Sequence, residues 1–141
     1  MAQITEHFSF EEMTHTDYED LQLLNRLEAR KDHRVMENLI LLCEDLLEPI
    51  REHFKLPVQV NSGYRCFTVN EAAGGSKNSQ HMNGAAADIC IPGVDIAKVW
   101  EWIVNRSGLR WHQAIYYPKH SFIHVSLPTG HEDMQVIAKG K

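Results

Sequence analysis

Three side chains in this sequence have the types and spacing of metal ligands. His81 and Asp88 lie seven residues apart, and Gly84 is one of the small residues that separate them. Small residues let the backbone approach a bound ion or substrate closely. Asp88 alternates with Ala87 and Ile89, so in a strand its carboxylate points to the face opposite Ile89.

The third side chain, His124, lies in a second alternating segment, residues 122–127. Ile123 and Val125 share the face expected to reach the core, so His124 lies on the open face. Two histidines and one carboxylate fit a catalytic zinc site, because three protein ligands leave the fourth tetrahedral position for water. Zinc lowers the pKa of bound water to about 7 and polarises carbonyls, so amide hydrolysis is the natural reaction. The alternative is ordinary surface histidines, since nine histidines make chance pairings easy.

Two further polar residues lie near these segments. Arg65 follows a predicted strand that ends at Ser62, and its forked donors suit a substrate carboxylate or a developing oxyanion. The alternative for Arg65 is a surface salt bridge. Ser79 precedes His81 by two residues and can either bind substrate or hold the ligand loop.

Several segments have helical signals. The clearest is residues 35–54, where apolar side chains recur every three or four positions and Pro49 should bend or restart the helix. Ser9 and Asp95 suit helix caps. The expected helices start at residues 8–13, cover 35–54, run from Thr68 to Gly74 and cover 96–104, whereas residues 14–33 are too polar to assign.

The strands come mainly after the helices. Residues 56–62 and 85–91 read as strands, and residues 113–117 and 122–127 form a hairpin because a short turn joins them. This order favours an α+β domain with a small antiparallel sheet and helices packed on one side. We expect a single domain over residues 1–141, with its core in residues 8–128 and a loose tail over 129–141.

Composition narrows the class of protein. A chain of 141 residues with 43% hydrophobic and 23% charged residues is typical of one globular domain. Its net charge of −5 and lack of a basic cluster argue against nucleic acid as a partner, and no segment has membrane-spanning length. Three cysteines do not suggest a disulfide framework, although a bridge between Cys66 and Cys90 is conceivable.

Residues 79–88 resemble the SxHxxGxAxD signature of the M15 peptidases, the D-Ala-D-Ala carboxypeptidase and dipeptidase group. Ser62-Gly63-Tyr64-Arg65 resembles the SGYR segment of that family, and residues 122–125 resemble the block with the last metal ligand. The sequence is similar in particular to a small branch found in phages and bacterial genomes. The signature positions that match are Ser79, His81, Gly84, Ala86 and Asp88.

This resemblance implies a fold like that of the D-Ala-D-Ala peptidases and the hedgehog signalling domain. It implies Zn²⁺ on His81, Asp88 and His124, and a peptidoglycan stem peptide as substrate. It also favours Arg65 as a catalytic residue, with Tyr64 and Ser79 as substrate contacts. Residues 1–13 lack the basic start and apolar run of a secretion signal, so we expect synthesis in the cytoplasm and action at the wall after release or delivery.

The sequence departs from the family at the general base. Several M15 enzymes have a carboxylate three residues before the last histidine, where this chain has Ser121. His120 is the nearest titratable group, and a neutral imidazole could carry the proton; His112 is a second, weaker candidate. The alternatives are therefore a peptidase, a zinc-binding module without catalysis, and a structural protein whose metal stabilises the fold. The cleaved bond and the oligomeric state stay open.

Overall fold

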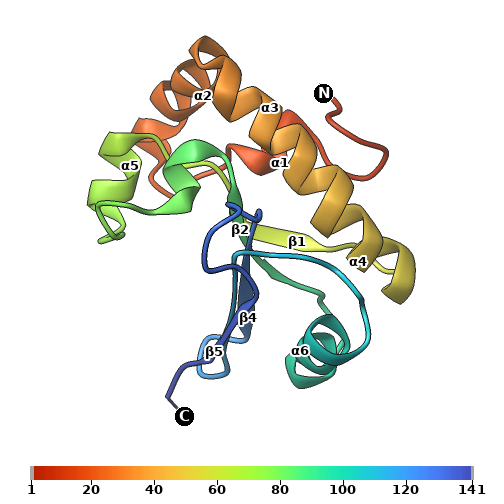
Figure 1. The fold of residues 1–141 in the computed structure, drawn as a ribbon. Helices are drawn as coiled ribbons and strands as arrows, with labels where there is room; N and C mark the ends of the chain where they lie inside the picture. Colours follow the sequence, from red (N-terminus) through yellow and green to blue (C-terminus); the bar gives the residue numbers. More distant parts are fainter. Residues whose placement is uncertain (1, 141) are drawn as a thin grey trace.

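The computed structural model describes residues 2–140, in which four helices precede a small sheet and two further helices lie between its strands (Figure 1). The helices are α1 (Phe10–Met13), α2 (Gln22–Lys31), α3 (His33–Leu42), α4 (Glu48–Phe54), α5 (Phe67–Ala72) and α6 (Ile96–Asn105), with short helical turns η1 (Glu19–Leu21), η2 (Cys43–Leu47) and η3 (Gln80–Asn83). The strands are β1 (Gln59–Ser62), β2 (Ala86–Cys90), β3 (Gln113–Tyr117), β4 (Phe122–Ser126) and β5 (Gln135–Ala138). The predicted α+β class is confirmed.

The five strands form one sheet in the order β1-β2-β4-β3-β5. The first three pairings are antiparallel, as predicted, but β5 pairs with β3 in parallel. The expectation of a wholly antiparallel sheet and a loose tail over residues 129–141 was therefore wrong. The tail is fixed because the Met134 and Gln135 amides donate to the carbonyls of Trp111 and His112, which extends the sheet by one edge strand.

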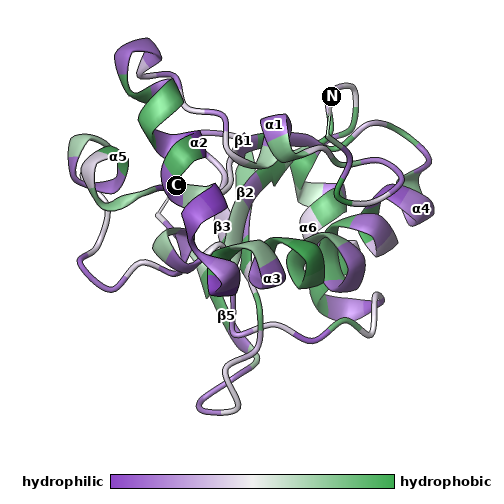
Figure 2. Cartoon of the chain, turned by 90° about the horizontal axis from the view of Figure 1, so that it is seen from above, coloured by the Kyte–Doolittle hydropathy of each residue, from purple (hydrophilic) through white to green (hydrophobic). Residues whose placement is uncertain are grey.

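The two faces of this sheet differ in character. Ala87, Val125 and Ala114 lie in one row across β2, β4 and β3 and are fully buried. The next row, Asp88, His124 and Ile115, points to the opposite face because side chains alternate along a strand. Figure 2 shows hydrophobic residues concentrated in the strands and along the helices that cover them.

Helices α3, α4 and α6 cover the apolar face. Leu39 in α3 and Ile50 in α4 are completely buried, and burial of such a side chain contributes roughly 1.5–3 kcal/mol. Helix α6 joins them through Trp102, whose ring stacks on His53 at 4.1 Å between centroids. Helix α5, in contrast, lies beside the other face. The prediction of helices on one side therefore holds for the three core helices.

Local signals explain where several helices begin. The predicted capping box is present, because Ser9 Oγ accepts from the Glu12 amide and Glu12 Oε1 accepts from the Ser9 amide. Asp95 caps α6 as expected. The predicted helix over residues 35–54 begins at His33 and widens into a π-helical turn, η2, just before Pro49. A wider turn there accommodates the missing N–H donor of the proline.

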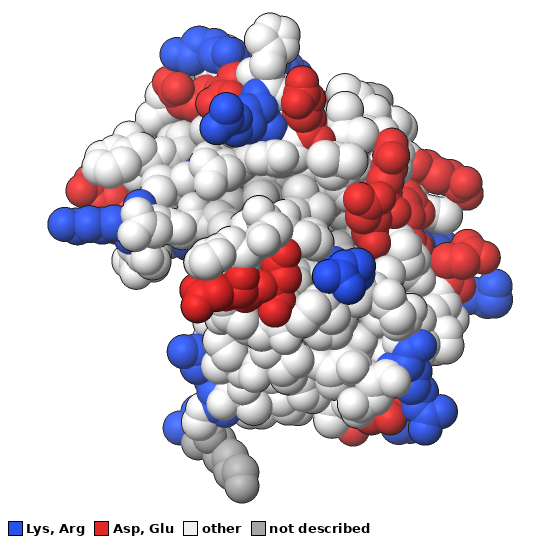
Figure 3. All heavy atoms as spheres, viewed as in Figure 1, with Lys and Arg blue, Asp and Glu red and all other residues white. Residues whose placement is uncertain are grey.

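Charged side chains cover the outer surface of the helical part. In the view of Figure 3, acidic side chains gather on the side where α3, α4 and the N-terminal segment lie, with Lys and Arg interspersed. None of the helices in residues 2–140 combines the length and hydropathy needed to cross a bilayer.

Candidate metal centre

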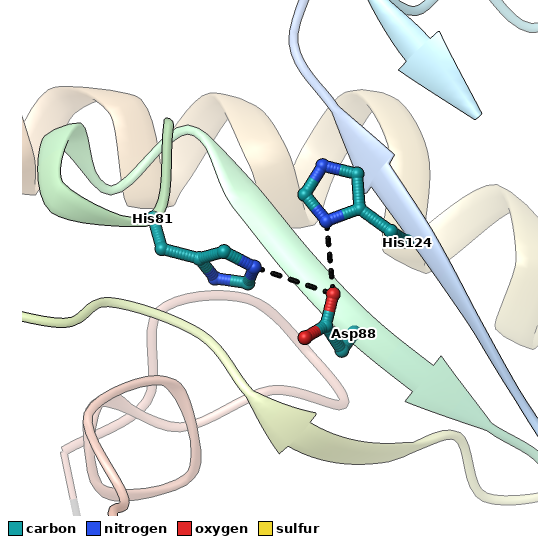
Figure 4. Close-up of side chains that lie close together, drawn as sticks. All are labelled: His81, Asp88 and His124. Atoms are coloured by element: carbon teal, nitrogen blue, oxygen red, sulfur yellow. Dashed lines mark hydrogen bonds and ion pairs between the residues drawn. The ribbon is translucent and has the colours of Figure 1, made fainter. Parts of the chain in front are cut away.

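His81, Asp88 and His124 meet on the open face of the sheet (Figure 4). His81 comes from η3, while Asp88 in β2 and His124 in β4 are direct register partners. One ligand atom from each residue lies within 4.8 Å of the others. His124 Nδ1 is 2.9 Å and His81 Nε2 is 3.2 Å from the same oxygen, Asp88 Oδ1. The fold thus brings together the three residues that the sequence indicated.

The protonation of His81 is set by a backbone carbonyl. Its Nδ1 lies 2.7 Å from the Gly63 oxygen, and because a carbonyl only accepts, Nδ1 must donate. In the neutral ring Nε2 therefore carries a lone pair. This atom is buried, has no hydrogen-bond partner in residues 2–140 and faces a carboxylate oxygen. Two acceptors at this distance repel each other unless a positive charge lies between them, and a metal cation held by both atoms would supply that charge.

Asp88 is suited to remain ionised as a ligand. Burial alone would raise its pKa, but the hydrogen bond from His124 and the adjacent His81 ring outweigh burial and hold the pKa well below its usual value. Arg65 Nη2 lies 3.7 Å from the other carboxylate oxygen. Catalytic zinc sites use ligands such as two imidazoles and one carboxylate, and a carbonyl often orients a ligating imidazole. The residues here match that pattern, so they fit the metal.

The Arg65 guanidinium is fixed beside this centre. Its side chain is 14% exposed, and Nη1 donates to Asn70 Oδ1 at 3.3 Å. Asn70 in turn donates to the Ser76 carbonyl, which ties Arg65 to the loop before η3. A Cβ on Gly75 would lie 2.1 Å from Asn70 Oδ1, so only glycine fits there without displacing Asn70. Sequence analysis missed Asn70, because its role depends on these contacts.

A second buried amide positions the segment that carries Gly63 and Arg65. Asn25 in α2 donates to the Tyr64 carbonyl at 3.0 Å and accepts from the Cys66 amide at 2.8 Å. A Cβ on Gly63 would lie 2.4 Å from the Met13 carbonyl oxygen, which explains why this position is glycine. Asn25 lies within residues 14–33, where sequence analysis assigned no structure.

Two cavities border the metal centre. The larger, about 520 Å³, is lined by the three candidate ligands together with Arg65, Ser79, His112, Ile115 and Tyr117. The smaller, about 350 Å³, lies between the residue 15–18 loop, β1 and α5. Both cavities are lined by Arg65 and Asp88, so these two side chains border a hollow on each side.

The remaining predicted residues differ in their placement. Ser79 lines the larger cavity and also caps η3 by accepting from the His81 amide at 3.2 Å. Tyr64 lies outside both cavities: its buried side chain turns to the opposite side of the backbone from its neighbour Arg65. The structure therefore does not support Tyr64 as a contact in these cavities. His120 is exposed in the β3–β4 turn and does not line the larger cavity, which has His112 on its wall.

Tyr117 is a further polar residue on the wall of the larger cavity. Tyr117 was not singled out from the sequence, yet it lines the larger cavity on the same face as Ile115 and His124. Burial raises its pKa, so its hydroxyl stays a hydrogen-bond donor at neutral pH. Cys66 and Cys90 are both free thiols, so the bridge considered between them is not formed.

Two histidines and one aspartate are the ligand set typical of metal-dependent hydrolases. The chain belongs to the peptidase M15 family, whose profile matches residues 6–126 and so includes all three candidate ligands. The comparison with curated proteins found no match. Membership of this family indicates a metallopeptidase that acts on a peptide substrate.

Proposed function

We propose that the protein is a zinc peptidase that cleaves a peptide bond in peptidoglycan stem peptides. The observation that carries the proposal is the buried Nε2 of His81, a lone pair that faces the Asp88 carboxylate without a hydrogen bond. His124 supplies the third donor. Two nitrogens and one oxygen favour zinc and leave a coordination position open to water. The resemblance of residues 79–88 to the M15 signature supports the peptidoglycan substrate.

Other residues around the metal centre orient the ligands, bind the peptide and stabilise the developing charge. A zinc ion at this site would polarise the scissile carbonyl and lower the pKa of a water molecule to about 7. Arg65 donates to the oxygen that gains negative charge, and Asn70 keeps the guanidinium in place for that task. Gly63 holds the His81 ring through its carbonyl. Ser79 lies on the cavity wall, where it contacts the bound peptide.

The two cavities on either side of Arg65 and Asp88 favour an endopeptidase over a carboxypeptidase. A carboxypeptidase needs a closed pocket with a cation for the terminal carboxylate, whereas an endopeptidase needs room on both sides of the scissile bond. Arg65 and Asp88 border both hollows, so a peptide bound at the centre can continue in both directions. We infer cleavage within a stem peptide or cross-link, after delivery of the protein to the wall.

One observation favours the alternative of a zinc-binding module with weak or absent catalysis. Asp88 is the one carboxylate among the described residues that line the larger cavity, and it is already used as a ligand. A second carboxylate to serve as general base is therefore not found there. Turnover decides between these functions, since both bind the metal.

Purified protein should be incubated with isolated sacculi, and the released fragments identified by mass spectrometry. We expect zinc-dependent release of internal fragments, its loss with chelator, and its recovery on adding zinc. His124→Ala is the matched inactive variant, and His131→Ala, an exposed histidine outside the centre, is the control. Release of terminal D-alanine alone would contradict the endopeptidase assignment. Stoichiometric zinc without any released fragment would establish the binding module instead.

A further inference from the structure

A hydrogen bond between a histidine and a carboxylate on the wall of the larger cavity has no part in the metal centre. His112 Nδ1 lies 3.0 Å from Asp133 Oδ1, and the two side chains are 20% and 13% exposed. The same carboxylate accepts from the amides of Thr129 at 2.9 Å and Gly130 at 2.8 Å. These two residues belong to the segment that leads into β5. The Asp133 carboxylate therefore holds both residues 129–130 and the His112 ring in place.

Asp133 is an anion at neutral pH. The backbone hydrogen bond from Thr129, together with those from His112 and Gly130, lowers the pKa of Asp133 to about 2. An ionised carboxylate only accepts hydrogen bonds, so His112 Nδ1 must carry the proton in this contact. The other ring nitrogen, Nε2, is then the one available to a bound ligand. His112 lines the cavity that also contains the metal ligands and Arg65.

The backbone around Asp133 is held in an unusual conformation. Glu132 and Met134, on either side of it, have positive φ angles of 51° and 65°. Residues with a Cβ adopt this region rarely, and such conformations persist where surrounding contacts fix them. Here the contacts are the bonds to Asp133 and the pairing of β5 with β3, which begins one residue after His112. The tail thus fixes the carboxylate against the imidazole.

We propose that His112, oriented by Asp133, is the residue that transfers the proton in the peptidase reaction; this assignment rests on the proposed function. His112 Nε2 takes a proton from water, directly or across one further water molecule, as the water oxygen bonds to the carbonyl carbon. It returns that proton to the amide nitrogen as the C–N bond breaks. Water and an amide become a carboxylic acid and an amine, and His112 ends the cycle neutral.

His112 takes the role of general base, for which the described lining of the larger cavity offers no second carboxylate. His120, the candidate from the sequence, lies exposed in the β3–β4 turn. His112 lines the cavity, and the Asp133 contact fixes its tautomer, as a catalytic imidazole requires. The ionisable groups that line the same cavity are the three candidate ligands, Arg65 and Tyr117.

A structural role must be separated from a catalytic one, because the contact between His112 and Asp133 also holds the tail. His112→Gln keeps an N–H donor for Asp133 but cannot carry a proton. We expect unchanged zinc content and unfolding temperature, a nearly unchanged KM, and a kcat about 10²–10⁴-fold lower. Asp133→Asn should lower kcat by less. His131→Gln, an exposed histidine of the same segment, should keep the kcat of the wild type.

The outcomes separate this proposal from the proposed function. Wild-type kcat in His112→Gln, with an active wild type, would overturn the assignment and leave the peptidase intact. A loss of kcat confined to His120→Gln would also overturn it, in favour of the turn histidine. An inactive wild type would overturn the proposed function, and this assignment with it.

A spectroscopic readout tests the geometry without any turnover. Long-range ¹H–¹⁵N correlation spectra of ¹⁵N-histidine-labelled protein report which nitrogen of neutral His112 carries the proton. We expect the Nδ1–H form in the zinc-loaded and zinc-free protein, and a mixture of tautomers in Asp133→Asn. A dominant Nε2–H form in the wild type would contradict the orientation by Asp133.

Discussion

Ile123 and His124 are neighbours in β4, yet their side chains leave the strand on opposite faces and into different surroundings. Ile123 is fully buried under the core helices, whereas His124 reaches the Asp88 carboxylate in the cavity. In β2 the same contrast separates Ile89 from Asp88. The strands therefore hold Asp88 and His124 rigidly, because each of these two ligands is flanked in sequence by residues packed in the core. Along β2 and β4, residues that stabilise the core therefore alternate with residues that can bind the metal.

The largest effect should come from removing a ligand. His124→Ala should abolish stoichiometric zinc binding and all zinc-dependent cleavage, because the two remaining donors cannot form a closed three-ligand set. Metal analysis by mass spectrometry after dialysis, together with the sacculus assay, checks both effects. The His131→Ala control should keep one zinc per chain. Full zinc occupancy in His124→Ala would show that the ligand set is wrong.

Substitution of Ile123, the residue next to His124, should lower stability without abolishing zinc binding. Ile123→Ala should lower the free energy of unfolding by about 2–5 kcal/mol, since it leaves a cavity under α6 and the other core helices. The folded fraction should still bind one zinc ion. Urea denaturation measures the change, and Val136→Ala, on the exposed side of β5, should have an effect within about 0.5 kcal/mol. Loss of zinc from folded Ile123→Ala would break the separation between the two faces.

Substitution of Arg65 tests whether a side chain on the open face contributes to catalysis without binding the metal. Arg65→Lys keeps the charge but loses the forked donors, so kcat should fall roughly 10²–10³-fold while zinc remains stoichiometric. Steady-state kinetics and metal analysis of the same sample provide the measurement. Arg106→Lys, on the exposed end of α6, is the matched control and should be unaffected. Wild-type kcat in Arg65→Lys would remove the arginine from the mechanism.

The smallest effect concerns the pH dependence of stability near the tail. Folding lowers the pKa of Asp133 from 3.8 to about 2, so its contribution to stability is fully present above pH about 4. It should be lost as the pH falls from about 4 towards 2. Thermal unfolding of wild type and Asp133→Asn across this range should show a gap at neutral pH that closes on acidification. A constant gap would mean that the charge of Asp133 does not stabilise the fold.

Much of the fold and the ligand set could be predicted from local patterns. Alternation in β2 and β4 indicated which face Asp88 and His124 occupy, and that prediction matches the register of the strands. The capping box at Ser9 and the hairpin of β3 and β4 follow from residues close together in sequence. Such features are visible in a sequence because the partners that determine them lie within a few positions.

The features that sequence analysis missed depend on distant partners. Helix α2 has a polar sequence, and its buried Asn25 is explained by bonds to residues about forty positions away. Strand β5 has four residues and pairs in parallel, so its position depends on the turn that Asp133 stabilises. His112 ranked below His120 because His120 is closer to His124 in sequence. In the fold, however, His112 is the one that lines the larger cavity. Local periodicity contains none of this information.

X-ray absorption spectroscopy on the zinc-loaded protein tests the central claim most directly. We expect one zinc per chain, with two imidazole nitrogens at about 2.0–2.1 Å, oxygen ligands at about 2.0–2.2 Å and no sulfur. The spectrum should lose an imidazole contribution in His81→Ala if that variant retains metal. A sulfur shell at about 2.3 Å, or a spectrum unchanged by His81→Ala, would contradict a centre formed by His81, Asp88 and His124.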